Sequence, residues 1–174
     1  DLVYAGGGDD KIFGDNAVGN PNNHFGNADQ LFGENGNDFI YGGEGADRIY
    51  GGGGADTFVI QKGMGEIANS SYYAPEGGDI EGAINSVFNI TRIEDYGFLS
   101  GDRLLYSDDA TADVSANSFT GISDPMSGGG IDELQSVTGA WTGGFDTYTT
   151  FYLDTGSAYE ILAHVKTYDF GHTY

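Results

Sequence analysis

A nine-residue pattern repeated without a gap is the feature that most constrains this chain. Residues 33–41, 42–50 and 51–59 each carry glycine at the first and fourth places, aspartate at the sixth and an apolar residue at the eighth. Looser copies lie at residues 5–13, around Asp10, and 24–32, around Asp29, and residues 1–4 match the end of another unit. A short fixed period is typical of coils whose repeats stack on their neighbours. Because the chain starts inside a unit, we expect further repeats upstream in a longer parent protein.

The repeat predicts a parallel β-roll over residues 1–61. A six-residue glycine-rich turn followed by a three-residue strand can wind into a flattened coil with two units per circuit. Side chains alternate between the faces of a strand, so the eighth place points inward. The inward residues are Val3, Ile12, Leu31, Ile40, Ile49 and Phe58. The segment between Asp10 and Asp29 lacks an apolar eighth place, so we expect an inserted loop near residues 14–23.

The aspartate in every unit indicates calcium. Glycines at the first, second and fourth places permit positive φ and bring backbone carbonyls close together, and a buried carbonyl needs a partner. Calcium takes six to eight oxygens, including carbonyls and carboxylates. Turns on one edge of the coil are two units apart, so Asp29 should face Asp47 and Asp38 should face Asp56, each pair sharing an ion. The predicted ligands are Asp10, Asp29, Asp38, Asp47 and Asp56, with Gly33, Asn35, Gly36, Asn37, Gly42, Glu44, Gly45, Ala46, Gly51, Gly53 and Ala55 from the turns.

The charge of the chain supports this interpretation. Lys and Arg number 6 against 27 Asp and Glu, a formal net charge of −21. A compact body with this charge repels itself unless cations neutralise it, and nucleic acid or anionic membranes are poor partners because they require basic residues. Cysteine is absent, which excludes disulfides and thiolate metal sites. No apolar run approaches the ~18 residues of a membrane helix, whereas 39% hydrophobic residues allow a packed core.

Residues 62–174 contain no repeat and predict a different β structure. Strand-like runs rich in β-branched and aromatic residues occupy 86–93, 102–106, 147–153 and 159–165. Residues 64–82 are expected to be an irregular connection and 107–144 mostly loops with short strands, with one possible helical turn in "DELQSV". The expected fold class is therefore all-β: a parallel β-roll followed by a β-sandwich-like C-terminal capping region.

The nonapeptide resembles the RTX repeat of secreted bacterial toxins, proteases, lipases and epimerases. The clean match covers residues 33–59, and the "ADTFVI" and "ITRIEDYGFLSGDRLLYS" segments resemble, in the same order, those that follow RTX repeats. This resemblance implies calcium binding and type I secretion from a Gram-negative bacterium. The end of the chain, "YDFGHTY", departs from the acidic-then-apolar ending that the family often shows, so the secretion signal is trimmed, altered or missing.

Other motifs leave some alternatives open. "LDTGSA" at residues 153–158 matches the loop that carries the catalytic carboxylate of aspartic proteases, but those enzymes need two such aspartates, and an ordinary turn between two strands explains one copy. His24, His164 and His172 lack zinc-site spacing. An additional calcium site in the second half has Asp95, Asp102, Asp108 and Asp109 as candidates. The tyrosines favour strand faces over a sugar-stacking platform.

The resulting functional hypothesis is a non-enzymatic, calcium-binding module at the C-terminal end of a larger secreted protein, with any catalytic domain upstream. Inside the cell the charge would keep the chain unfolded, and extracellular calcium would fold it. One alternative is a structural or adhesive surface-layer or filament protein that assembles through calcium or open strand edges. Another is a polysaccharide-binding accessory module of an extracellular enzyme. All three place the protein outside the cell or at its surface.

Overall fold

The computed structural model describes residues 1–15, 26–75, 77–97, 100–108, 134–143 and 146–166. In this part the chain is almost entirely β, as the sequence predicted. The strands are β1 (Leu2–Gly7), β2 (Lys11–Phe13), β3 (Gln30–Asn35), β4 (Phe39–Tyr41), β5 (Arg48–Gly53), β6 (Thr57–Gln61), β7 (Glu66–Ile67), β8 (Thr91–Ile93), β9 (Arg103–Ser107), β10 (Leu134–Gly143), β11 (Asp146–Asp154) and β12 (Tyr159–Lys166). Two short helices, η1 (Ser70–Tyr72) and α1 (Ile80–Asn85), complete it.

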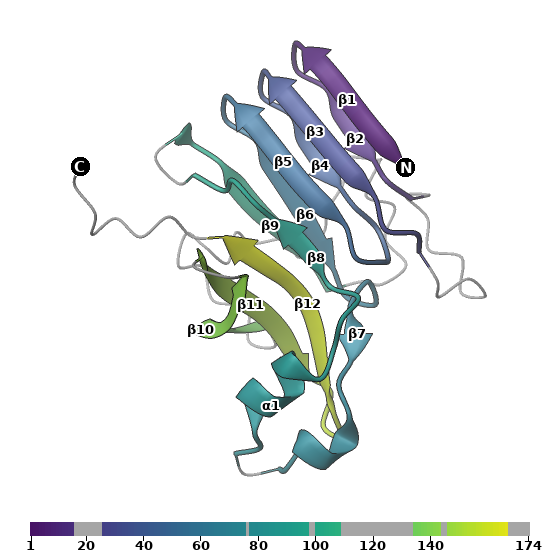
Figure 1. The fold of residues 1–174 in the computed structure, drawn as a ribbon, viewed down its shortest axis with the longest axis vertical. Helices are drawn as coiled ribbons and strands as arrows, with labels where there is room; N and C mark the ends of the chain where they lie inside the picture. The colour runs from purple at the N-terminus through teal and green to yellow at the C-terminus, as the bar shows by residue number, and fades with distance from the viewer. Residues whose placement is uncertain (16–25, 76, 98–99, 109–133, 144–145, 167–174) are drawn as a thin grey trace.

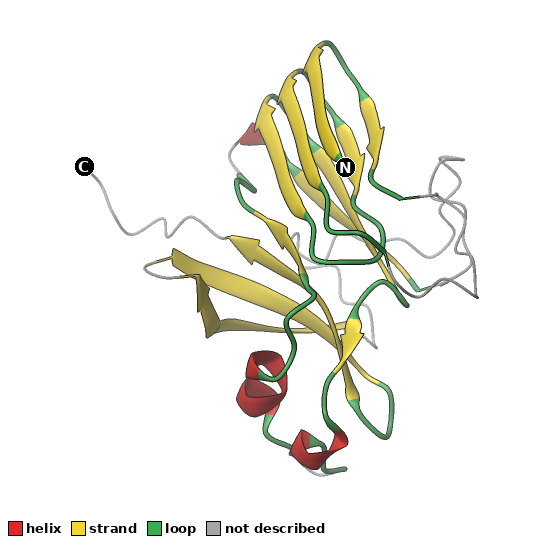
Figure 2. Cartoon of the chain, turned by 45° about the vertical axis from the view of Figure 1, so that its right-hand side comes forward, coloured by secondary structure: helices red, strands yellow, loops and turns green. Residues whose placement is uncertain are grey.

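The repeats form a parallel β-roll made of two facing sheets. Strands β1, β3 and β5 lie side by side in the larger sheet, and β2, β4 and β6 lie behind them in the smaller one (Figures 1 and 2). Every pairing within these two sets is parallel. The chain therefore alternates between the sheets, one strand from each nonapeptide, and the turns collect along the two edges.

The apolar eighth place fills the space between the two sheets, as predicted. Leu31, Ile40, Ile49 and Phe58 are each at most 1% exposed, Ile12 is also buried, and Val3 packs against them from the outermost strand. A Val, Leu, Ile or Phe side chain contributes roughly 1.5–3 kcal/mol when fully buried. This single row of residues thus supplies the hydrophobic core of the roll.

The spacing between stacked coils differs at one place. Leu31 pairs with Ile49, 18 residues later, whereas Val3 pairs with Leu31, 28 residues later. The first coil therefore contains ten residues more than the second. Residues 16–25, in this first coil, lie outside the described part of the chain. The insertion leaves the register of the ladder intact on both sides.

The parallel pairing also continues past residue 61, where the repeat pattern ends. Strand β8 extends the larger sheet through Arg48–Arg92 and Ile49–Ile93, and β9 extends the smaller one through Phe58–Leu104. A last coil without the glycine pattern thus closes the roll. This differs from the boundary expected from the sequence, because the pairing needs only a strand with an inward apolar residue and not the nonapeptide turn.

The C-terminal strands are joined to the roll by its larger sheet. Strand β12 pairs in parallel with β8, and β11 and β10 follow in antiparallel order, so the sheet runs β1-β3-β5-β8-β12-β11-β10. Within the connection expected to be irregular, Asp79 caps α1 by accepting from Gly82 N. Residues 134–137, considered for a helical turn, belong to strand β10.

The Asp-Thr-Gly motif forms the turn between β11 and β12. Asp154 Oδ1 accepts from Gly156 N at 2.8 Å, and Thr155 Oγ1 donates to Ala158 O at 2.9 Å. Side chains of this type commonly close turns by bonding to nearby backbone groups. Turn chemistry therefore accounts for this motif.

The glycines of the repeat serve two different purposes. At the second and fourth places the backbone has positive φ, for example 99° at Gly52 and 142° at Gly54. The first-place glycines do not share this conformation, which corrects the sequence-based expectation. They are required for space: a Cβ on Gly33, Gly42 or Gly51 would lie 2.3 Å from the Oδ2 atom of the aspartate of the same unit.

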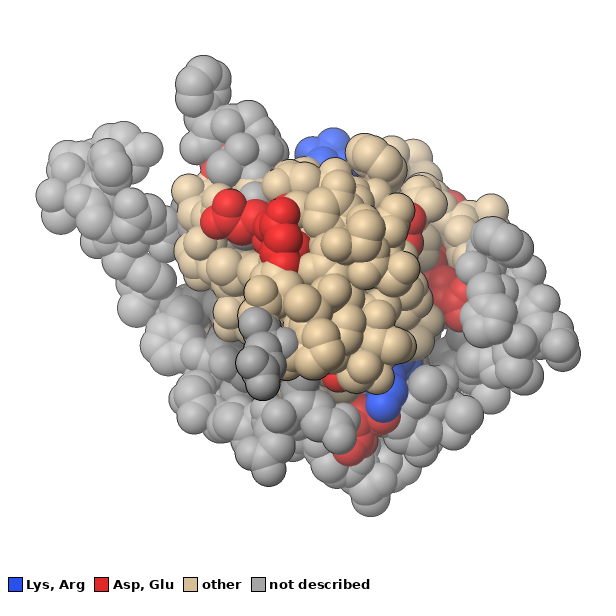
Figure 3. All heavy atoms as spheres, turned by 90° about the horizontal axis from the view of Figure 1, so that it is seen from below, with Lys and Arg blue, Asp and Glu red and all other residues tan. Residues whose placement is uncertain are grey.

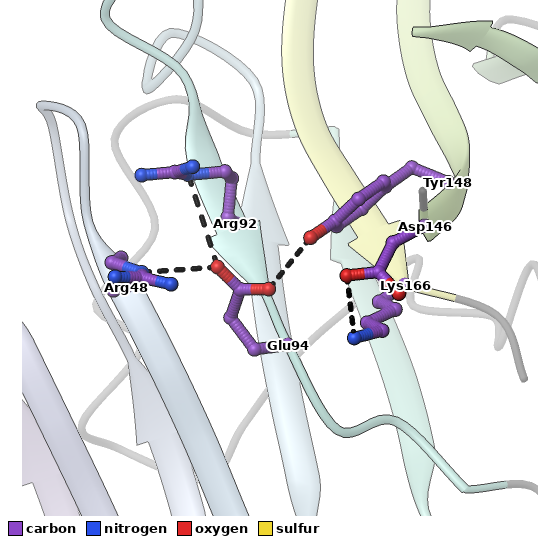
Figure 4. A network of polar contacts seen from close by, with 6 residues as sticks. All are labelled: Arg48, Arg92, Glu94, Asp146, Tyr148 and Lys166. Carbon is purple, nitrogen blue, oxygen red and sulfur yellow. Dashed lines mark hydrogen bonds and ion pairs between the residues drawn. The ribbon is translucent and has the colours of Figure 1, made fainter. Parts of the chain in front are cut away.

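A polar network fastens the C-terminal strands to the roll. The buried carboxylate of Glu94 accepts from Arg48 Nε on β5 at 3.0 Å and from Tyr148 Oη on β11 at 2.7 Å, with Arg92 at 4.0 Å (Figure 4). Nearby, Lys166 pairs with Asp146 at 2.8 Å between β12 and β11. Glu94 therefore connects strands that the repeat does not organise.

Replacing this carboxylate tests its role. Glu94→Gln is expected to lower the free energy of unfolding by about 1–2 kcal/mol, because it removes a buried charge and leaves Arg48 without its counter-ion. Urea denaturation in excess calcium measures the change. The matched control is Asp146→Asn, which breaks a more exposed pair and should cost at most about 0.5 kcal/mol; equal losses would show that Glu94 has no special role.

Glu34 offers a second test, since it is the one described non-glycine residue with positive φ, at 74°. Glu34→Gly should raise the free energy of unfolding by about 0.5–1 kcal/mol by relieving the contact between Cβ and the backbone. Glu44→Gly, at the third place of the next unit, should instead lower it, because Glu44 has no positive φ for glycine to relieve and glycine adds entropy to the unfolded chain. Thermal unfolding of both variants in calcium provides the comparison.

Candidate metal centre

A ladder of aspartates runs along one edge of the roll, across the turns between the larger and the smaller sheet. The backbone N–H of Asp10 donates to Asp38 Oδ1 at 2.9 Å, that of Asp38 to Asp56 Oδ1 at 2.9 Å, and that of Asp56 to Asp102 Oδ1 at 3.0 Å. We call this series the first ladder. Each sixth-place aspartate therefore uses one carboxylate oxygen to bind the backbone of the coil before it.

A second ladder follows the opposite edge by the same rule. Asp1 N donates to Asp29 Oδ1, and Asp29 N donates to Asp47 Oδ1 at 3.0 Å. Thr91 takes the next position, and its hydroxyl donates to Asp47 Oδ2 at 3.0 Å and to Gly45 O at 3.3 Å. The predicted facing of Asp29 with Asp47, and of Asp38 with Asp56, is thus seen in the structure.

The other carboxylate oxygen of these aspartates is buried without a partner. Asp29, Asp38 and Asp56 are each at most 2% exposed, and their Oδ2 atoms, like that of Asp10, accept no hydrogen bond. A buried carboxylate is strongly unfavourable unless it is paired or binds a metal. Acidic patches cover more of the surface visible in Figure 3 than basic ones do, in line with the net charge of −21. The unpaired oxygens therefore fit a bound cation.

Carbonyl oxygens converge on the same positions. A Cβ on Gly33 would lie 2.3 Å from Asp38 Oδ2 and 2.6 Å from Gly51 O of the next coil, and one on Gly14 would lie 2.5 Å from Asp29 Oδ2 and 2.4 Å from Gly42 O. In both places a carboxylate and a carbonyl from successive coils meet beside a glycine that leaves them room. Hard oxygen ligands of these two kinds are those that calcium prefers.

The remaining predicted turn residues also lie on these edges, and several are already hydrogen bonded. Asn35 O accepts from Gly8 N, and Gly53 O accepts from Gly36 N. Asn37 donates to Asp9 Oδ1 and accepts from Ala55 N through its side chain. Glu44, Gly45 and Ala46 form the turn beside Asp47 and border a cavity of about 340 Å³. Asn37 therefore holds successive turns together. The sequence predicted it only as a calcium ligand.

Metal binding here would depend on the backbone as much as on side chains. Among the described residues, no group of three His, Cys, Asp or Glu side chains is placed to hold a metal ion. One or two carboxylates per position need additional oxygens, and the turn carbonyls supply them. This donor set excludes zinc, which prefers nitrogen and sulfur ligands, and favours calcium.

The last coil contains two aspartates, Asp102 and Asp95, whose contacts with the repeat were not predicted from the sequence. Asp102 was proposed only for an unspecified extra calcium site, yet it ends the first ladder, with its Oδ2 accepting from Gly97 N at 2.8 Å. Asp95 accepts from Gly51 N and Gly52 N, both at 2.9 Å. The signal was present in "GDRL", which keeps the sixth-place aspartate and the eighth-place apolar residue. Asp108 is exposed, and Asp109 lies outside the described residues.

His164 has a structural environment. It is 3% exposed, Trp141 stacks on its ring at 4.3 Å between centroids, and Nδ1 lies 2.9 Å from Thr150 Oγ1. Burial, with Arg92 nearby, lowers the pKa of His164 to about 4. The other two histidines, His24 and His172, lie outside the described residues.

Comparison with known proteins assigns the repeat to a family. Residues 1–17 and 25–58 match the family model of the RTX calcium-binding nonapeptide repeat, in four copies. The resemblance inferred from the nonapeptides is confirmed: this part of the chain consists of RTX calcium-binding repeats. No curated protein matches the chain. One similar solved structure is the AlgE6R3 subunit of the Azotobacter vinelandii mannuronan C5-epimerase, with 26% identity, 94% of this chain and 73% of that chain covered, and a TM-score of 0.41. No described helix could cross a membrane.

Without metal, the buried aspartates should make stability depend on pH. Burial raises the pKa of Asp47 to about 7 and that of Asp56 to about 6, from an ordinary value of 3.8. Groups with a raised pKa in the folded state stabilise it fully below pH 3.8, and this contribution is lost as the pH rises through 6 and 7. Metal-stripped protein should therefore resist urea better at pH 5 than at pH 8.

The double variant Asp47→Asn/Asp56→Asn serves as the control for this effect. It keeps an acceptor oxygen for each ladder bond but cannot titrate, so the difference between the two pH values should shrink. A difference of unchanged size would assign the pH dependence to the net charge of the whole chain.

Proposed function

We propose that the chain is a calcium-folded module of a larger secreted protein, in which bound calcium compensates the aspartate ladders and so closes the roll. The observation that carries this is the set of buried, unpaired Oδ2 atoms of Asp29, Asp38 and Asp56. In the absence of cations these carboxylates oppose folding; with calcium bound they stabilise stacked coils. The module supplies stability and a folding signal, and any enzymatic activity belongs to other domains of its parent.

The proposal includes a link between folding and export. A net charge of −21 favours an extended chain where calcium is scarce, as in the cytosol. Sites of this kind in extracellular proteins bind with Kd on the order of 10⁻⁴–10⁻³ M, so they fill only outside the cell. Binding to the folded state alone stabilises it by mass action. We therefore assign the module to an extracellular setting reached by type I secretion.

The experiment is a calcium titration followed by circular dichroism. The metal-stripped chain at pH 7.5 should gain β structure between about 0.1 and 5 mM calcium. Asp38→Asn/Asp56→Asn should shift the midpoint at least tenfold higher, because it retains the Oδ1 acceptors and removes two ligand charges. Asp154→Asn, in the exposed hairpin, should leave the midpoint unchanged. A chain that is fully folded in chelator would refute the folding switch.

A second candidate, calcium-dependent assembly of subunits, is favoured by exposed apolar side chains on β1. Leu2 and Tyr4 are 60% and 61% exposed there, and the Tyr4 ring stacks at 4.8 Å on Phe32. Sedimentation velocity in calcium separates the two candidates, since a monomer supports the module and a calcium-dependent polymer supports assembly. A polysaccharide partner has less support, because Arg48 and Lys166 on the sheet face are already paired with Glu94 and Asp146.

A further inference from the structure

Asp15 is a half-buried aspartate that the repeat does not explain. It stands at the second place of its unit, where the later units have Glu34, Gly43 and Gly52, and it is not a sixth-place aspartate. Its Oδ2 atom is nevertheless buried and accepts no hydrogen bond. An acidic group in this state needs a counter-charge just as the ladder aspartates do.

The backbone around Asp15 supplies further oxygens. Asp15 N donates to Gly42 O at 3.2 Å, which fixes the residue against the turn of the next coil. A Cβ on Gly26 would lie 1.5 Å from Glu44 O and 2.6 Å from Asp15 Oδ2, and one on Gly43 would lie 2.8 Å from the same Oδ2. The Asp15 carboxylate and the Glu44 carbonyl therefore meet where two glycines leave them room.

Asp29 brings a second unpaired carboxylate oxygen to this edge. It is 2% exposed, its Oδ2 has no partner, and that atom lies together with Gly42 O beside Gly14, the neighbour of Asp15. Burial and the negative charge of Asp29 both raise the pKa of Asp15, as expected for carboxylates that lie close together. Two acidic groups and two carbonyls from successive coils thus lie along one edge, one carboxylate–carbonyl pair beside Gly14 and the other beside Gly26.

We propose that Asp15 and Asp29 together hold one divalent cation, with the carbonyl oxygens of Gly42 and Glu44. This inference rests on the proposed function, and it adds a ligand that the nonapeptide does not contain. Two carboxylates give this site one more negative charge than a site with a single repeat aspartate, so it should be the tightest on its edge.

The position of the ligands gives this ion a particular role. Gly14 and Asp15 precede the ten-residue insertion, Gly26 and Asp29 follow it, and Gly42 and Glu44 belong to the next coil. The ion would therefore join both ends of the insertion to the stacked turn. The added carboxylate compensates for the interrupted repeat at the point where the ladder would otherwise be weakest.

The test is isothermal titration of metal-stripped full-length chain with calcium, using four proteins: wild type, Asp15→Asn, Asp29→Asn and the double variant. Asp15→Asn should weaken one class of site at least tenfold, without changing the others. Asp29→Asn should weaken the same class. If both side chains bind one ion, the free energy of calcium binding lost in the double variant should be much smaller than the sum of the losses in the two single variants.

Asp9→Asn is the matched control, because Asp9 is an exposed carboxylate of the same coil that bonds to Asn37 on the other edge. Its titration should equal that of the wild type. The inference is overturned if Asp15→Asn behaves like Asp9→Asn, if it only stabilises the calcium-free chain, or if the Asp15 and Asp29 losses add. A wild type that binds no calcium would instead overturn the proposed function itself, so the two failures are distinct.

Discussion

The hydrogen bond from each aspartate N–H to the Oδ1 atom of the aspartate one coil later is the interaction on which the rest of the roll depends. It sets the register of successive turns, and it buries a carboxylate at every step, as at Asp38 and Asp56. The same side chain therefore both aligns the coils and adds an uncompensated charge. The hydrophobic row between the sheets cannot remove that charge, whereas a calcium ion bound to the repeat would offset it.

At the end of the roll, the carboxylates have more hydrogen-bond donors around them. The hydroxyl of Thr91 satisfies Asp47, and both oxygens of Asp102 accept backbone hydrogen bonds. Asp95 holds the first turn of the preceding coil. Hydrogen bonds thus satisfy these carboxylates at the last coil, and Glu94, next in the chain to Asp95, connects this coil to the antiparallel strands.

The sequence predicted the structure well where interactions follow a local period. The inward rows and the facing of Asp29 with Asp47 depend only on a spacing of nine, which can be counted along the chain. The last coil could not be predicted in this way, because Arg92 pairs with Arg48, 44 residues earlier, and the sequence has no repeat after residue 61 that would set this separation. The position of Asp15 beside Gly26 and Glu44 could not be predicted for a related reason, because the ten-residue insertion interrupts the period of nine between Asp15 and Gly26.

The first-place glycines have an evolutionary consequence. A methyl group at Gly33 or Gly51 would displace the carboxylate oxygen beside it. A single added carbon could therefore abolish ion binding at one site without altering any charge. The repeat at residues 5–13 already carries Ala5 at this place. Drift at glycine codons could therefore adjust how many ions a roll of fixed length binds, and with it the calcium level at which the protein becomes folded.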